Sequence, residues 1–159
     1  MDFPHLDDSG RARMVDVTAK EPTVRSATAR GAVHCSAEVV DRLRTGSVPK
    51  GDVLAVARIA GIQAAKSTPT LLPLAHVIGV HGATVDLTVT DDGVEIEATV
   101  RTADRTGVEM EALTAVSVAG LAVIDMVKGL DRTASLHDVR VVAKSGGRSG
   151  DWRRPGEPG

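Results

Sequence analysis

The chain has almost no Phe, Trp or Tyr: Phe3 and Trp152 are the only such residues among 159. Both lie near the ends of the chain, so the hydrophobic core must be built from Val, Leu, Ile, Ala and Met side chains. Proteins that bind RNA or single-stranded DNA commonly stack bases on aromatic rings of a sheet. The composition therefore argues against that class of binder.

Cysteine and an excess of one charge are also missing. Cys35 is the only cysteine, which excludes an intrachain disulfide and a cysteine-based metal cluster. The 19 basic and 21 acidic residues give a net charge of -2, which disfavours general binding to nucleic acid or to acidic membranes. No segment has the pattern of a signal peptide or an uninterrupted membrane span. We therefore expect a cytoplasmic protein with neither a membrane nor a nucleic-acid partner.

The length of the chain fits one domain with a single core. Residues 14–151 carry the apolar and periodic segments, and we assign them to this domain. Residues 1–13 are polar and aperiodic, so we expect a flexible N-terminal arm. We expect a flexible C-terminal tail over residues 152–159.

The longest apolar segment, Thr106–Lys128, predicts a buried helix. Thr106 and Glu109 have the spacing of a capping box, and Gly129 stands where a C′ glycine ends many helices. Small residues recur at spacings of three and four along this segment, at Ala112, Ala115, Ala119 and Ala122. This strip would let a second backbone approach closely.

Shorter patterns predict the remaining elements, and together with the long apolar helix the main ones follow the order strand, helix, strand, strand, helix, strand. They are a strand over 23–35, a short helix over 36–44, a long helix from 52 that Pro69 ends, a hairpin over 85–100 and a strand over 136–144 whose Val139, Val141 and Ala143 share one side. This order is typical of a ferredoxin-like α+β fold, an antiparallel sheet with two long helices packed on one face.

The charged residues of the long apolar helix are the first candidates for function. Glu111, Asp125 and Lys128 share one face. At about 1.5 Å of rise per residue, Glu111 and Asp125 are roughly 21 Å apart. Either the two carboxylates serve separate roles or two subunits assemble one site. The alternative is that both are ordinary solvated or salt-bridged residues.

Other polar residues could bind anions or transfer protons. The candidate cations are Arg25, Lys50, Lys66, Lys128, Lys144 and Arg148, and the candidate proton-transfer groups are His76, Glu109, Glu111, Asp125 and Lys128. No group of His, Asp and Glu residues shows a recognised ligand spacing, so we predict no metal site. These residues indicate an α+β domain with a polyanion site, either an enzyme or a non-catalytic binder of nucleotides.

Five segments carry a resemblance to a known family. They are MVDVTAK at 14–20, KGDVLAVARIAGIQAAK at 50–66, LLPLAH at 71–76, RTGVEMEALTAVSVAGLAVIDMVK at 105–128 and KSGGRSGD at 144–151. Together they resemble the cyclic pyranopterin monophosphate synthase family of molybdenum cofactor biosynthesis. The resemblance implies a ferredoxin-like subunit in a homohexamer, a trimer of dimers, with sites near subunit interfaces.

The resemblance also implies the activity, that of a lyase acting downstream of a radical S-adenosylmethionine enzyme. Its substrate would be cyclic 7,8-dihydroguanosine triphosphate, converted to cyclic pyranopterin monophosphate with release of pyrophosphate. Asp125 and Lys128 match the family's catalytic pair. The residues that match its substrate-contacting or other functional positions are Leu74, Ala75, His76, Met110, Glu111, Lys50, Lys66, Glu109, Lys144 and Arg25. This pattern requires no cofactor, and it leaves open whether Mg²⁺ accompanies the triphosphate.

The chain departs from the family pattern at a few positions. Ala75 stands where the family usually has cysteine, and Val77 where it often has proline. Arg148 replaces a common lysine and keeps the positive charge. These changes leave the implied catalytic pair intact, so an active enzyme is favoured over a catalytically degenerate nucleotide-binding relative.

Overall fold

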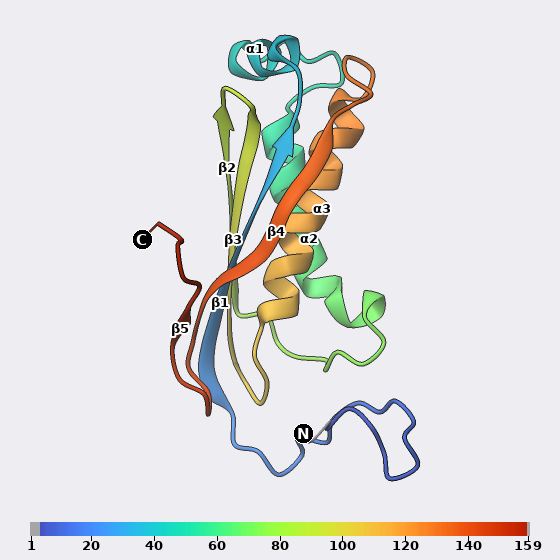
Figure 1. Cartoon of the computed structure of the whole chain (residues 1–159), viewed down its shortest axis with the longest axis vertical. Helices are drawn as coiled ribbons and strands as arrows, with labels where there is room; N and C mark the ends of the chain where they lie inside the picture. The colour runs from blue at the N-terminus through green and yellow to red at the C-terminus, as the bar shows by residue number, and fades with distance from the viewer. Residues whose placement is uncertain (1–3, 159) are drawn as a thin grey trace.

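The structure is a computed structural model that describes residues 4–158. The elements are β1 (Thr23–His34), α1 (Ala37–Thr45), α2 (Val53–Leu71), β2 (Gly82–Thr90), β3 (Gly93–Asp104), α3 (Glu109–Val127), β4 (Ser135–Ser145) and β5 (Trp152–Arg153). The strands form one antiparallel sheet in the order β2-β3-β1-β4-β5. Figure 1 shows α2 and α3 on the same face of this sheet. The predicted ferredoxin-like α+β fold is confirmed; the predicted short helix is α1, and β5 is an additional strand.

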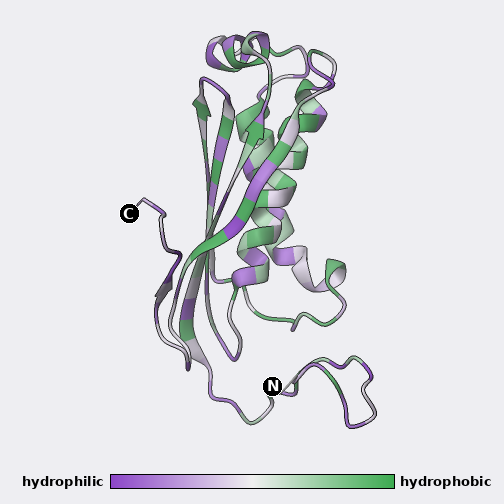
Figure 2. Ribbon diagram, in the orientation of Figure 1, coloured by the Kyte–Doolittle hydropathy of each residue, from purple (hydrophilic) through white to green (hydrophobic). Residues whose placement is uncertain are grey.

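The core lies between the sheet and the two long helices. The strands alternate between hydrophobic and hydrophilic residues (Figure 2), and the side chains of Val94, Ile96, Ala98 and Val100 on β3 are buried. By length and composition alone α3 could cross a membrane, but here it packs against α2, β1, β3 and β4. Its apolar character therefore reflects its place at the centre of the domain.

The predicted alanine strip brings α3 and α2 close together. Ala115 and Ala119 are fully buried, and Gly61 of α2 faces them. A Cβ atom at Gly61 would lie 3.0 Å from the Ala115 carbonyl oxygen and 3.2 Å from Ala119 Cβ. Only a glycine on one helix against alanines on the other allows this separation.

The predicted ends of α3 are wrong by one to three residues. The helix begins at Glu109 with Val108 at the N-cap position, and no side chain caps it, so Thr106 is not part of a capping box. The Glu109 carboxylate pairs instead with Lys144 on β4. At the other end Gly129 does not have the positive φ of a C′ glycine. The turn is closed by the N–H groups of Leu130 and Asp131, which both donate to the Val127 carbonyl.

Pro69 does not end α2, as predicted, but lies inside it, two residues before its end. A proline leaves the carbonyl four residues earlier without its N–H donor. That carbonyl belongs to Ala65, and the buried Thr68 hydroxyl donates to it at 3.1 Å and to the Ala64 carbonyl at 3.2 Å. The threonine thus supplies the donor that proline lacks, and the helix continues.

β4 carries irregularities that the predicted alternation missed. Its register against β1 shifts between Thr28 and Ala29 and again between Arg30 and Ala32. Val142 is therefore the buried residue of this stretch, whereas Val139, Val141 and Ala143 were predicted to share a side. Each bulge adds a residue to one strand and changes which face the following side chains occupy.

Both terminal segments have defined positions over the residues described. Leu6 and Ala12 pair as an isolated antiparallel bridge in the segment predicted as a flexible arm. In the segment predicted as a tail, Trp152 of β5 pairs with Lys144 of β4. Residues 1–3 and 159 of these two segments lie outside the described residues.

Candidate active site

A cluster of charged residues lies where α3 ends. Lys128 Nζ is 2.6 Å from Asp125 Oδ1, and Lys50 Nζ donates to the Asp125 carbonyl oxygen at 3.0 Å and lies 3.9 Å from Oδ1. The hydrogen bond from Lys128, its charge and then the charge of Lys50 lower the pKa of Asp125. Two ammonium groups beside one carboxylate leave a net positive charge. This cluster, Lys50, Asp125 and Lys128, is exposed and could hold an anionic ligand next to a charged carboxylate.

At the other end of α3 lies a cavity of about 990 Å³. Three segments form its walls: the N-terminal segment, the loop after α2 and the first turn of α3. The lining residues are His5, Ala12, Val15, Val17, Lys20, Leu72, Pro73, Leu74, Ala75, His76, Thr106, Gly107, Glu109, Met110 and Glu111. All six of the predicted residues from 74–76 and 109–111 therefore line one cavity. The loop after α2 and the start of α3 lie in the lower part of Figure 1.

Glu111 is the buried charged group of this cavity. The residue is only 3% exposed, and within the part of the chain that the structure describes its Oε2 atom has no hydrogen-bond partner. Burial raises the pKa of Glu111 to about 7, and the charge of Glu109 acts in the same direction. A carboxyl group with this pKa can give or take a proton near neutral pH.

His76 links the loop after α2 to the N-terminal segment. Its Nε2–H donates to the backbone carbonyl oxygen of Val15. This bond fixes the tautomer and leaves Nδ1 as an acceptor. Of the two family departures beside it, Ala75 lines the cavity, whereas Val77 is 86% exposed.

Lys144 and Arg25 form a positive corner next to the cavity. Lys144 Nζ lies 3.5 Å from Glu109 Oε1 and 3.4 Å from the Ser149 hydroxyl oxygen. Gly147 packs directly on the Arg25 guanidinium, where a side chain would collide with it. Arg25 Nε is buried and has no hydrogen-bond partner among residues 4–158, which is uncommon for a buried donor.

The remaining predicted residues are not brought together in one chain. Lys66 is exposed on α2 and is absent from the cavity lining. Asp125 is one helix length away from Glu111, a separation of roughly 21 Å at 1.5 Å per residue. Apart from Lys66, the predicted set therefore divides into the cluster at the end of α3 and the cavity at its start, with Lys144 and Arg25 beside the cavity.

The structure adds residues to the cavity that carried no role in the sequence prediction. His5, Val15, Val17 and Lys20 line it because the N-terminal segment folds back towards the loop after α2. The sequence signal that could have indicated them was the MVDVTAK segment of the resemblance, which contains three of these four residues. Within residues 4–158 no group of three or more His, Cys, Asp and Glu side chains is arranged to hold a metal ion.

Comparison with known proteins gives consistent matches. Residues 14–147 match the sequence model of the MoaC family. A Nocardioides sp. protein named cyclic pyranopterin monophosphate synthase is 62% identical over 154 residues, which cover 95% of this chain and 94% of that protein. Proteins of the same name from Roseiflexus sp. (58% over 153 residues, 95% and 97% covered) and Desulfitobacterium hafniense (50% over 155 residues, 97% and 95% covered) are also similar. The matched residues include the Asp125 cluster and most of the cavity.

Proposed function

The chain belongs to the MoaC family, and from this membership we propose that it is a cyclic pyranopterin monophosphate synthase, a lyase of molybdenum cofactor biosynthesis. Its substrate is cyclic 7,8-dihydroguanosine triphosphate, which a radical S-adenosylmethionine enzyme supplies in the cytoplasm. The product is cyclic pyranopterin monophosphate, and pyrophosphate leaves. The relatives at 50–62% identity over nearly the whole chain carry this proposal.

Pyrophosphate release requires a sugar hydroxyl to attack the first phosphorus while the bond to pyrophosphate breaks. The phosphate oxygens gain charge during this step, and fixed cations stabilise it. We assign this role to Lys50, Lys66, Lys144 and Arg25. The unpartnered buried Nε of Arg25 and the pair of ammonium groups around Asp125 support the assignment.

Ring opening and closure require proton transfer. Asp125 and Lys128 are 2.6 Å apart, so one can pass a proton to a substrate atom while the other balances the charge. Glu111, in the apolar cavity, has a pKa suited to the same chemistry. Leu74, Ala75, His76, Met110 and Glu109 would surround the ring system. No step requires a resident cofactor.

A complete site then needs more than one subunit. Asp125 and Glu111 lie at opposite ends of α3, so the two carboxyl groups of one chain cannot reach the same small substrate. We propose that the protein is a homohexamer, a trimer of dimers, in which the end of α3 in one subunit meets the cavity of a neighbour. Exposed apolar residues on the helices, Val56 and Ile59 of α2 and Leu121 of α3, support such a contact.

One assay tests the activity. The purified protein is incubated with cyclic 7,8-dihydroguanosine triphosphate, and pyrophosphate and the pterin product are measured. We expect stoichiometric release of both. Tight binding of the nucleotide without pyrophosphate would instead identify a non-catalytic binder and overturn the proposal.

A further inference from the structure

The C-terminal segment Trp152–Pro158, which we call the strap, runs from the edge strand β5 to contacts with Arg140 of β4 and Arg30 of β1. Figure 1 shows it on the side of the sheet away from the helices. It starts as β5, where Trp152 pairs with Lys144 and Arg153 with Ala143. Nothing in the proposed chemistry uses the strap. Its contacts nevertheless begin at a lysine that the proposed function assigns to phosphate binding.

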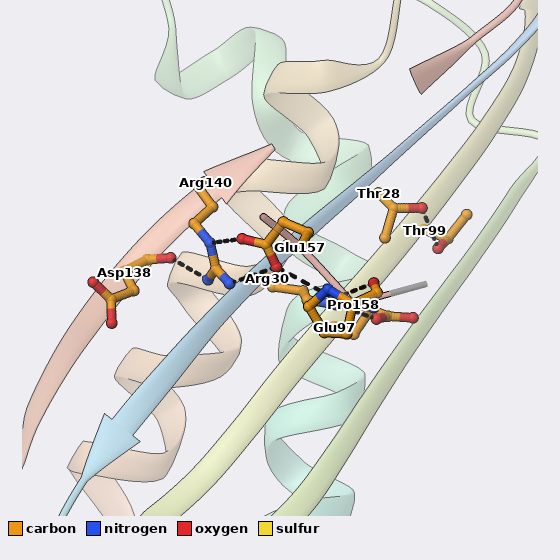
Figure 3. A network of polar contacts seen from close by, with 8 residues as sticks. All are labelled: Thr28, Arg30, Glu97, Thr99, Asp138, Arg140, Glu157 and Pro158. Atoms are coloured by element: carbon orange, nitrogen blue, oxygen red, sulfur yellow. Dashed lines mark hydrogen bonds and ion pairs between the residues drawn. The ribbon is translucent and has the colours of Figure 1, made fainter. Parts of the chain in front are cut away.

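Glu157 anchors the far end of the strap. Arg140 donates from Nε to Glu157 Oε1 at 2.6 Å and from Nη2 to Oε2 at 2.9 Å, and Arg30 Nη1 donates to Oε2 at 3.3 Å (Figure 3). The Glu157 side chain is only 9% exposed. Two-point pairs between arginine and carboxylate are among the strongest polar contacts in proteins. The strap is therefore bound to β4 and β1 through one carboxylate.

Arg154, between these two ends, ties the strap to the irregular part of β4. Its backbone N–H donates to the Val142 carbonyl at 2.8 Å, and its Nε donates to the Val141 carbonyl at 2.7 Å. Val142 is the residue that the register shift leaves without a partner on β1. The strap thus satisfies the carbonyls of the bulge that immediately precedes Lys144.

The loop between β4 and β5 depends on both of its ends. It contains Gly146, Gly147 and Gly150, all with positive φ, and glycine backbones hold their conformation weakly. Inside the loop, Gly146 N–H donates to Asp151 Oδ1 at 3.3 Å, and Gly150 N–H to the Gly147 carbonyl at 3.3 Å. The pairing of β4 with β5, the first part of the strap, holds the two ends of this loop together.

We propose that Glu157 is a positioning residue, which holds the strap against the sheet and thereby fixes the glycine-rich loop and Lys144 for binding the phosphate groups of the substrate. This inference rests on the proposed function. Loss of the anchor loosens Lys144 and the contact of Gly147 with Arg25. The Asp125 cluster is held by its own contacts with Lys50 and Lys128 and not by the strap, so proton transfer there is unaffected. Phosphate binding should weaken while the chemical step keeps its rate.

The test compares Glu157→Gln with Glu95→Gln. Glu95 is exposed on the same face of the sheet, so the control makes the same change in charge outside the network. Trp152 is the only tryptophan and is 41% exposed, so acrylamide quenching of its fluorescence is combined with hydrogen exchange of the Arg154 N–H, which donates to the Val142 carbonyl. Together they report release of the strap. Calorimetry with inorganic triphosphate measures phosphate binding without turnover, and steady-state assays give KM and kcat.

For Glu157→Gln we expect stronger quenching and a rise of roughly three- to tenfold in both the triphosphate Kd and KM, the effect of losing about one charged hydrogen bond. The value of kcat should stay within about twofold, and Glu95→Gln should change none of these quantities. Arg140→Lys, which keeps the charge but loses the two-point pair, should resemble Glu157→Gln.

Two results overturn the inference. Stronger quenching with an unchanged triphosphate Kd would show that the strap does not position the phosphate site. Unchanged quenching together with unchanged exchange of the Arg154 N–H would show that Glu157 does not hold the strap. If the wild-type protein binds triphosphate but makes no pterin, the proposed function fails, whereas the Kd comparison still decides the role of Glu157.

Discussion

Lys50 and Asp125 are 75 positions apart in the chain, yet Lys50 Nζ donates to the Asp125 backbone carbonyl at 3.0 Å. The carbonyls at the end of a helix lack intrahelical donors and carry the negative end of the helix dipole, so a cation is favoured there. The turn before α2 thus delivers a second ammonium group to the carboxylate that Lys128 already contacts. The cluster is built from two elements that the sequence alone does not relate.

Replacement of either member of the proposed catalytic pair should abolish turnover. Asp125→Asn removes the proton acceptor, and Lys128→Ala removes its partner, so each should lower kcat by about a hundredfold or more. Both side chains are exposed, so the oligomer and the unfolding midpoint should stay close to wild type. Pyrophosphate release and size-exclusion chromatography measure the two properties. Asp41→Asn, on the exposed face of α1, is the matched control, and near-normal turnover in both site variants would reject these roles.

Two inactive variants should restore activity when they share an oligomer. Asp125→Asn and Glu111→Gln remove groups at opposite ends of α3. If each site takes these ends from different subunits, random mixing by unfolding and refolding leaves about a quarter of the sites with both wild-type groups. We therefore expect about a quarter of wild-type pyrophosphate release from the mixture. Mixed oligomers that stay inactive would contradict a site shared between subunits.

Glu111 should make the protein less stable as the pH rises. Its pKa is raised to about 7 from the ordinary value of 4.5, so the folded state holds a proton that the unfolded state has lost between these values. Stability should fall from about pH 4.5 to 7 by an amount on the order of 1–3 kcal/mol. Glu111→Gln carries no titrating group and should remove this dependence, becoming more stable than wild type at pH 8.

Urea unfolding at several pH values and one fixed protein concentration checks this expectation, since the stability of an oligomer depends on concentration. Equal slopes against pH for wild type and Glu111→Gln would show that the buried carboxyl is not protonated in the folded state at neutral pH.

Thr68 should stabilise α2 through the carbonyl that Pro69 leaves free. Thr68→Val keeps the shape but removes the donor to Ala65, so the free energy of unfolding should fall by about 1–3 kcal/mol. Adding Pro69→Ala supplies a backbone N–H to the same carbonyl and should recover part of that loss. Urea unfolding of the two single variants and the double variant measures the coupling. Additive effects would mean that the two residues act independently.

Local patterns predicted most of the elements of the fold. The short helix predicted over 36–44 is α1, with the Ser36 side chain accepting from the Val39 N–H at its N-cap, and the predicted hairpin is formed by β2 and β3. The predicted ends of α2 and α3 were wrong where a side chain makes a different hydrogen bond or ion pair from the one expected. The Glu109 carboxylate pairs with Lys144 on β4 and does not form the expected capping box. The Thr68 hydroxyl donates to the Ala65 carbonyl, so α2 continues beyond Pro69.

The candidate site was predicted in parts. The resemblance named the residues of the cavity that lie at 74–76 and 109–111, because these segments are distinctive in sequence. It gave no role to His5, Val15, Val17 and Lys20, since only the folding back of the N-terminal segment places them at the cavity. It also gave no role to Glu157, which lies beyond the segments of the resemblance and gains its partners by crossing the sheet.

By itself, the sequence determined the type and order of the long elements, the family and the two ends of α3 at which chemistry can occur. These depend on periodicity and on spacing along one helix, which short-range sterics and hydrogen bonds fix. Only the tertiary structure decided the environment of each charged group. Glu111 is buried and Asp125 is exposed, although both share a face of one helix. That difference arises because the loop after α2 and the N-terminal segment cover only one end of α3 and remove only that carboxyl group from water.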